Sequence, residues 1–255
     1  MLCVADVGNT HTVLGIYSND ALVHRWRIRT IRDRTTDEWG LTIASFFDFD
    51  KIDTSMVKGM VISSVVPPAL HALRRASKRY FDVDALIVGP GVKTGLSILY
   101  DNPREVGADR VANAVAALSR VDSACIVVDF GTATTFDCLS SRGEYLGGAI
   151  APGLRISLDA LVTRAAKLPR VEIGKPERAI GRNTEEAMQS GVLYGYAALV
   201  DGLVDRLSTE IDANVSVIAT GGLSGVIAAE SRTIDDVDQD LTLDGLRIIF
   251  QRNNP

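Results

Sequence analysis

The chain has 255 residues, of which 46% are hydrophobic and 23% charged, and its formal net charge is −5 at pH 7. This length can bury a large core, either as one domain or as two halves of about 120 residues. The composition is ordinary for a globular protein. No basic stripe is obvious, and the one Arg-dense stretch, 24–34, alternates with apolar and acidic residues and is interpreted as a strand and its following loop. We therefore expect no nucleic-acid partner.

Neither a membrane span nor a signal peptide is expected. No apolar run reaches 18 residues, and Met1–Val7 lacks a basic segment and leads directly into a strand. The cysteines Cys3, Cys125 and Cys138 are odd in number and form no C-x-x-C pair. They therefore indicate reduced, buried thiols in a cytoplasmic protein, with no redox or zinc role.

The first part of the chain predicts an antiparallel meander followed by helices and further strands. Short β-rich runs bounded by turns predict strands at 1–7, 12–17, 21–29, 59–65 and 85–88. A helix is expected from Thr36, which we predict as its cap, to Phe47. A second helix is expected over 69–80, opened by Pro67-Pro68.

The second part of the chain repeats a similar mixture. After a less regular stretch over 94–110, apolar residues at helical spacing predict a helix over 109–120. Further strands are expected at 124–129, 136–139, 145–150 and 215–220, and further helices at 152–164, 184–208 and 222–229.

An internal repeat is the strongest signal of organisation. The segment VADVGNTHTVLGIY (4–17) aligns with VVDFGTATTFDCLS (127–140), and the aligned Asp6 and Asp129 are 123 residues apart. Each copy reads as a strand, an Asp-x-Gly loop rich in Thr, and a second strand. We therefore predict two duplicated halves, 1–118 and 119–255, with a ligand site in the cleft between them.

The two loops suit phosphate chemistry. An Asp at the end of a strand, followed by a Gly turn, places a carboxylate beside exposed backbone N–H groups and Thr hydroxyls. The candidates are Asp6, Gly8, Asn9, Thr10 and Thr12 in the first loop, and Asp129, Gly131, Thr132, Thr134 and Thr135 in the second. A third Gly-rich turn, 219–225, follows a strand and could pack against a flat ring or a phosphate.

The order of these sites matches the sugar kinase, Hsp70 and actin superfamily. Within it, the sequence closely resembles the type III pantothenate kinases over nearly the whole chain. The resemblance depends on DVGNTHT (6–12), GADR (107–110), DFGTATT (129–135), GGAIAPG (147–153), the NT pair at 183–184, ATGGLSG (219–225) and LTLDGLRIIFQRN (241–253).

The resemblance implies an α/β fold of two ribonuclease-H-like (actin-like ATPase) halves with mixed β-sheets and flanking helices. It implies a homodimer that transfers the γ-phosphoryl group of ATP to the primary hydroxyl of pantothenate, the first step of coenzyme A synthesis. It also implies a divalent metal such as Mg²⁺ with ATP, and a monovalent cation, K⁺ or NH₄⁺.

The same resemblance assigns roles on the acceptor side. Asp109 matches the general base, and Arg110 would face an anion such as the pantothenate carboxylate. The other implied substrate contacts are Tyr100, Gly107, Ala108 and Thr184. Structural alternatives stay open: Asp109 and Thr184 could be helix caps, Arg110 a surface ion pair, and Tyr100 a half-buried core residue.

On the nucleotide side, the resemblance implies that Thr132 contacts an ATP phosphate and that Asp129 holds the monovalent cation. The implied ATP loop is Asp6, Val7, Gly8, Asn9, Thr10, His11, Thr12 and Val13. Asp6 would orient the divalent metal, most simply through water. A catalytic role for His11 is not expected, because a kinase of this layout uses a carboxylate base.

Two other functions are compatible with the fold. A non-catalytic regulator could bind a nucleotide or a pantothenate-like ligand, and its base position would have decayed, whereas Asp109 is present. A hydrolase of the same superfamily would activate water and lack a pocket for an organic acceptor. GADR and Tyr100 argue against it by resemblance alone.

Overall fold

The computed structural model describes residues 1–165, 167–211 and 214–254. The chain forms two compact units, which are described separately. Unit 1 comprises Met1–Leu96, Asp101–Ala116 and Leu241–Pro255, and unit 2 comprises Ser97–Tyr100 and Ala117–Asp240.

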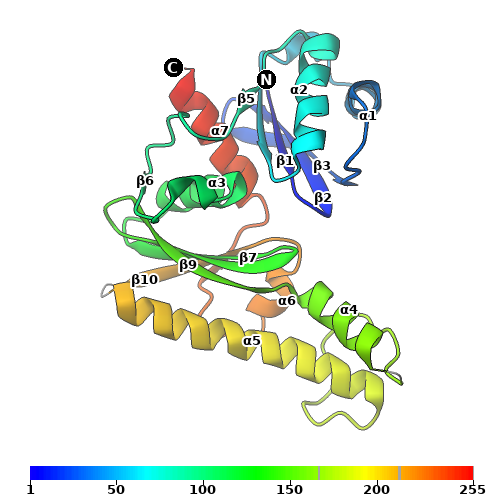
Figure 1. The fold of residues 1–255 in the computed structure, drawn as a ribbon, viewed down its shortest axis with the longest axis vertical. Helices are drawn as coiled ribbons and strands as arrows, with labels where there is room; N and C mark the ends of the chain where they lie inside the picture. Colours follow the sequence, from blue (N-terminus) through cyan, green and yellow to red (C-terminus); the bar gives the residue numbers. More distant parts are fainter. Residues whose placement is uncertain (166, 212–213, 255) are drawn as a thin grey trace. The chain divides into compact units, whose positions relative to one another are not determined.

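Unit 1 contains a five-stranded mixed sheet in the order β3-β2-β1-β4-β5 (Figure 1). Its strands are β1 (Leu2–Val7), β2 (His11–Ser18), β3 (Ala21–Arg29), β4 (Gly59–Ser64) and β5 (Leu86–Ile87). β1, β2 and β3 form the expected antiparallel meander, while β4 runs parallel to β1 and β5 parallel to β4. The predicted strands are confirmed with end shifts of a few residues.

One face of this sheet is covered by α1 (Thr36–Phe49) and α2 (Pro67–Phe81). Alternate residues of β1, including Ala5 and Val7, share one apolar core with Trp39 of α1 and Leu73 of α2. Because successive side chains of a strand point to opposite faces, Val4 and Asp6 lie on the other face.

The other face is covered by α7 (Leu241–Asn253). A Cβ atom on Gly15 of β2 would lie 3.1 Å from Leu243, and one on Gly59 of β4 would overlap the ring of Phe250. The sequence-based prediction of two halves, 1–118 and 119–255, assigns this C-terminal segment to the second half. In the structure the segment belongs to unit 1. Helical periodicity gives the apolar side of a helix but does not say which sheet that side covers.

The start of α1 corrects one residue of the sequence prediction. The cap is Thr35, not Thr36: Thr35 Oγ1 accepts the N–H of Glu38 at 3.3 Å, and Glu38 Oε2 accepts the N–H of Thr35 at 2.7 Å. These hydrogen bonds to Thr35 lower the pKa of the Glu38 carboxyl. The reciprocal pair is a capping box, which requires Glu three residues after the cap, and only Thr35 meets that spacing.

Unit 2 contains a six-stranded mixed sheet in the order β11-β10-β7-β8-β9-β6. Its strands are β6 (Ser97–Ile98), β7 (Ala124–Phe130), β8 (Ala133–Leu139), β9 (Glu144–Pro152), β10 (Val215–Thr220) and β11 (Asp236–Val237). The antiparallel meander β7-β8-β9, with β10 parallel to β7, repeats the arrangement of β1-β2-β3 with β4. The sequence repeat therefore corresponds to a repeat of topology.

The long helix α5 (Thr184–Ile211) lies along one face of the unit 2 sheet (Figure 1). Ile126 and Val128 of β7 share an apolar core with Leu193 and Val200 of α5. Alternation therefore turns Asp129 to the face away from α5. The remaining helices are α3 (Ala108–Leu118), α4 (Leu154–Arg164), α6 (Ser224–Ala228) and the short 3₁₀ helices η1 (Thr54–Met56) and η2 (Pro103–Glu105).

Cys3, Cys125 and Cys138 are buried free thiols, as predicted. Burial raises the pKa of both Cys3 and Cys125 to about 12, so these two thiols stay protonated and unreactive near neutral pH. Among the described residues, none of the helices is long and apolar enough to cross a membrane.

Candidate active site

The first Asp-Gly loop connects β1 to β2 in unit 1. The N–H of Gly8 donates to the carbonyl oxygen of His11 at 3.0 Å, which closes the turn, and Asn9, Thr10 and His11 are exposed at its tip. The hydroxyl of Thr12 is buried and shares a 2.9 Å hydrogen bond with Thr30. Thr12 therefore stabilises the base of the loop, and the exposed tip is the part available to a phosphate.

Asp6 lies at the end of β1, half-buried, on the face of the sheet that α7 covers. Its register partner on the parallel strand β4 is Ser63. The Ser63 hydroxyl is shielded from solvent and makes no hydrogen bond with any described residue. A carboxylate beside an available hydroxyl suits a hydrated cation, so the site fits the predicted metal role of Asp6.

The GADR segment forms the start of α3. Asp109 is the second residue of this helix, so it is not the N-cap that the sequence left open. Its Oδ1 accepts the backbone N–H of Arg110 at 2.8 Å, and the carbonyl of Gly107 accepts the N–H of Val111 at 3.0 Å. A Cβ atom on Gly107 would lie 2.5 Å from Asp109 Oδ1. Gly107 thus leaves the space in which the half-buried carboxylate sits.

Helix α3 is held against α7. Gly245 of α7 lies so close to Ala112 that a Cβ atom on Gly245 would overlap the Ala112 carbonyl. Thr242 Oγ1 also donates to Asn113 Oδ1 at 2.7 Å. Helix α7 also covers the face of the sheet that carries Asp6. Within unit 1, the strand that leads into the first loop and the helix that carries Asp109 therefore both pack against α7.

In unit 2, the second Asp-Gly loop and the Gly-Gly turn come together. Asp129 of β7 is the register partner of Thr220, the residue before the turn. Gly221 has φ +90°, and a Cβ atom there would lie 2.6 Å from Asp129 Oδ1 and 2.7 Å from the carbonyl oxygen of Phe130. Only glycine fits this backbone and this approach without strain.

Oxygen atoms gather around Asp129. Its partner on β8 is Thr135, whose hydroxyl is shielded from solvent and has no hydrogen-bond partner within the part of the chain that the structure describes. Together with the nearby Phe130 carbonyl, these are the neutral and anionic oxygen ligands that hard cations prefer. The donor set therefore fits a cation at Asp129.

A metal site can also be made entirely of His, Cys, Asp and Glu side chains. Within the described ranges, no group of three or more His, Cys, Asp or Glu residues could hold a metal ion. Mg²⁺ that is bound with a nucleotide commonly takes most of its ligands from phosphates and water.

The tip of the second loop touches the start of α4. The N–H of Gly153, the N-cap of α4, donates to the carbonyl oxygen of Thr132 at 3.1 Å. A Cβ atom on Gly153 would overlap that carbonyl. No side chain caps α4, so its first N–H groups and its dipole are positioned for an anion beside Thr132. Sequence analysis had not singled out Gly153, although it closes the GGAIAPG motif.

Tyr100 follows β6 and is half-buried in unit 2. Its ring packs edge-on against Tyr145 with centroids 6.2 Å apart, and it borders Gly147 of β9. The Tyr145 hydroxyl donates to Asp137 Oδ1 at 2.6 Å. Tyr100 therefore has the burial expected of a core residue, and its role as a substrate contact stays a prediction.

Thr184 is exposed at the start of α5. The helix is capped by Asn183, whose Oδ1 accepts the N–H of Glu186 at 2.9 Å, so Thr184 is not the cap. Met188, the first buried residue of α5, comes four residues later, about 6 Å along the helix. Thr184 is therefore presented at the end of the helix, before its first buried residue.

The fold and these loops define a class of protein. Each of the two mixed sheets has an antiparallel meander followed by two parallel strands, with an Asp-Gly loop after the first strand of the meander. This arrangement is that of the sugar kinase and actin-like ATP-binding fold. Solved structures agree: a putative 2-dehydro-3-deoxygalactonokinase from Sinorhizobium meliloti matches with a TM-score of 0.62 at 13% identity, covering 100% of both chains. A putative Baf family transcriptional activator from Campylobacter jejuni matches with a TM-score of 0.61 at 17% identity, covering 99% and 98%.

The family is given by sequence. The sequence model of the type III pantothenate kinases matches residues 1–206, and the chain belongs to that family. A type III pantothenate kinase from Geotalea daltonii is 56% identical over 253 residues, covering 99% of both chains. One from Syntrophus aciditrophicus is 54% identical over 254 residues, covering 100% of both. The predicted family and fold class are confirmed.

Proposed function

We propose that this protein transfers the γ-phosphoryl group of ATP to the primary hydroxyl of pantothenate, giving 4'-phosphopantothenate and ADP. The observation that carries the proposal is the half-buried Asp109 carboxylate at the start of α3, within the GADR motif of a type III pantothenate kinase chain. A non-catalytic regulator of the same fold would not need this carboxylate.

The chemistry assigns a proton to Asp109. As the pantothenate hydroxyl oxygen bonds to the γ-phosphorus, its proton passes to an Asp109 oxygen and the bond to the β-phosphate oxygen breaks. Oδ1 already accepts the Arg110 N–H, so the second oxygen is the one assigned to the substrate. Arg110 offers a planar pair of donors for the pantothenate carboxylate, and Gly107, Ala108, Tyr100 and Thr184 complete the proposed substrate contacts.

Each unit supplies its own set of groups for binding ATP. In unit 1, the loop from Asp6 to Val13 supplies backbone N–H groups for phosphates, and Asp6 orients the divalent metal through water. In unit 2, Thr132 and the first turn of α4 supply donors, and the turn at Gly221 supplies a flat surface for the adenine ring. A divalent metal bound with ATP neutralises charge that develops on the transferred phosphoryl group.

The test of the function is ADP release measured with and without pantothenate. We expect release to depend on pantothenate and to yield one phosphorylated product per ADP, identified by mass spectrometry. ADP release that ignores pantothenate would support a hydrolase instead. Binding of pantothenate or ATP without any turnover would support the regulator.

We further propose that Asp129 holds K⁺ or NH₄⁺. Replacing K⁺ by Na⁺ is expected to lower the rate roughly tenfold, equivalent to about 1.4 kcal/mol. Asp129→Asn should remove this difference between the cations, because the anionic ligand is lost while the shape is kept. The measurement is the rate in matched chloride buffers. Equal rates of the unchanged protein in K⁺ and Na⁺ would refute the cation role.

We propose a homodimer whose interface involves unit 2. Exposed apolar side chains recur at intervals in the sequence of this unit: Leu146, Ile150, Ile156, Leu161 and Ile180. They precede Thr184, which we propose contributes to the pantothenate site at the dimer. Exposed apolar surface of this kind is typical of an interface between copies.

The dimer is tested by a charged substitution on this surface. Ile156→Asp combined with Leu161→Asp should give monomers in sedimentation velocity and raise the KM for pantothenate more than that for ATP. Leu41→Asp on α1 is the control for an exposed apolar residue elsewhere, since Leu41 is 61% exposed, Ile156 44% and Leu161 43%. A dimer that survives the first pair, or is lost in the control, would contradict this interface.

We also propose a cytoplasmic location, which the three buried free thiols support, because such thiols persist in a reducing compartment.

A further inference from the structure

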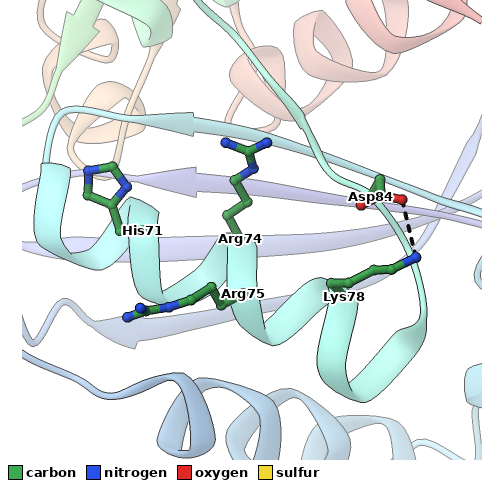
Figure 2. A pocket seen from close by; sticks show the side chains of 5 residues that line it. All are labelled: His71, Arg74, Arg75, Lys78 and Asp84. Carbon is green, nitrogen blue, oxygen red and sulfur yellow. Dashed lines mark hydrogen bonds and ion pairs between the residues drawn. The ribbon is translucent and has the colours of Figure 1, made fainter.

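One side of α2 gathers basic side chains around a groove of about 330 Å³. His71, Arg74, Arg75 and Lys78 line it from successive turns of the helix, and Asp84 borders it from the segment after the helix (Figure 2). We call this hollow the α2 groove. Its volume lies at the lower end of the range that small-molecule sites occupy.

The basic residues of the α2 groove differ in how they are paired. Lys78 contacts Asp82 at 3.0 Å and Asp84 at 3.2 Å, and these hydrogen bonds raise its pKa. The guanidinium groups of Arg74 and Arg75 make no ion pair or hydrogen bond with any part of the chain that the structure describes. In a chain of net charge −5, Arg74 and Arg75 are consecutive residues whose unneutralised guanidinium groups point to different sides of α2 (Figure 2), and together they give a local excess of positive charge.

The positive charge extends into a neighbouring hollow of about 380 Å³. Arg75 lines both hollows, and the second one is also lined by Arg32 and Arg34 and by the carboxylates Asp33 and Asp37. The Arg34 guanidinium lies over the Trp39 ring at 4.9 Å, and its Nη1 is shielded from solvent and makes no hydrogen bond with a described residue. Arginines therefore outnumber carboxylates in the lining of the second hollow by three to two.

We propose that the α2 groove binds a compact small anion with two or more phosphoryl groups, held by Arg74 and Arg75. Guanidinium groups bind phosphate oxygens through two parallel N–H donors, which makes Arg the preferred residue for such ligands. His71 and Lys78 are seven residues apart, or about 10 Å along the helix, which suits a chain of two or three phosphoryl groups.

The rim of the groove explains why a compact ligand is favoured over a long polyanion. Asp37 binds Arg79 at 2.9 Å on one side, and Asp82 and Asp84 bind Lys78 on the other. A nucleic-acid backbone or an extended acidic peptide crossing the helix would meet these carboxylates. A short polyphosphate contacts only the groove, where the lining carboxylate Asp84 is paired with Lys78. This site is additional to the proposed phosphorylation reaction and does not depend on it.

The test is isothermal titration calorimetry with inorganic tripolyphosphate as the probe. The double variant Arg74→Gln/Arg75→Gln should bind at least about tenfold more weakly at this site, because two charge-assisted contacts are lost. Arg27→Gln/Lys58→Gln removes two exposed charges elsewhere in unit 1 and should bind like the unchanged protein. Tripolyphosphate bound at the ATP loops would appear as a separate equivalent that survives in both variants.

Arg74→Lys/Arg75→Lys keeps the charge but loses the paired donors, and should give intermediate affinity. The proposal is overturned if the Gln pair binds tripolyphosphate as the unchanged protein does, or if the unchanged protein shows no equivalent that the Gln pair lacks. If hexaglutamate bound with the same affinity as tripolyphosphate, the proposal that the ligand carries phosphoryl groups would be overturned. Because Arg74 and Arg75 are exposed and unpaired, the Gln pair should melt within a few degrees of the unchanged protein.

Discussion

Asp109→Asn is expected to lower kcat for pantothenate phosphorylation by about 10²- to 10⁴-fold, the usual contribution of a positioned general base. Asn keeps the size of the side chain and an oxygen that can accept the Arg110 N–H, now 2.8 Å from Asp109 Oδ1. The start of α3 should therefore keep its shape. What is lost is the oxygen that takes the proton from the attacking hydroxyl.

The expected signature is a loss in kcat with little change in the KM for ATP, because Asp109 is assigned to the acceptor and not to the nucleotide. Asp122→Asn is the matched control: Asp122 is an exposed carboxylate just beyond the other end of α3. It should retain full activity. A fully active Asp109→Asn enzyme would remove Asp109 from the base role. Equal losses in both variants would indicate a general effect of charge.

Local sequence patterns predicted the strands and helices well where an element is long enough to show a hydrophobic pattern. β3 and β10 begin and end at the predicted residues. β3 alternates exposed and half-buried side chains with a period of two, whereas β10 is a short apolar run that ends at a Gly-Gly turn. The two-residue strands β6 and β11 have too few residues to show any period. The cap of α1 was misplaced by one residue because Thr35 and Thr36 have the same side chain, and only the reach of Glu38 distinguishes them.

The motifs of the site could be predicted from the sequence, but the residues that contact those motifs in the folded chain could not. The Asp-Gly loops are visible as a repeat, and GADR as a resemblance. The hydroxyls beside the two key carboxylates are a matter of register: Ser63 meets Asp6 through β1 and β4, which are about 57 residues apart in sequence. In the same way, Gly153 touches Thr132 only because β8 and β9 return the chain to the loop. Such contacts depend on pairing that no short window of sequence contains.

Gly245 illustrates the same limit and gives the second large prediction. Gly245→Ala should destabilise the protein by about 3 kcal/mol, because the new methyl would overlap the Ala112 carbonyl and force α3 and α7 apart. An Ala at this helical position would otherwise be favourable by about 1 kcal/mol, so the loss must come from the contact. The measurement is chemical unfolding followed by circular dichroism.

The matched control is Gly202→Ala in α5, where an added Cβ atom meets nothing within 4 Å and the same helical gain is unopposed. It should stabilise the protein by up to about 1 kcal/mol. Activity separates the two further: Gly245→Ala should lower kcat even where the protein is fully folded, since α7 positions the helix that carries Asp109. If Gly245→Ala were as stable as the control, α3 and α7 would not be in the close contact on which the placement of the Asp109 helix depends.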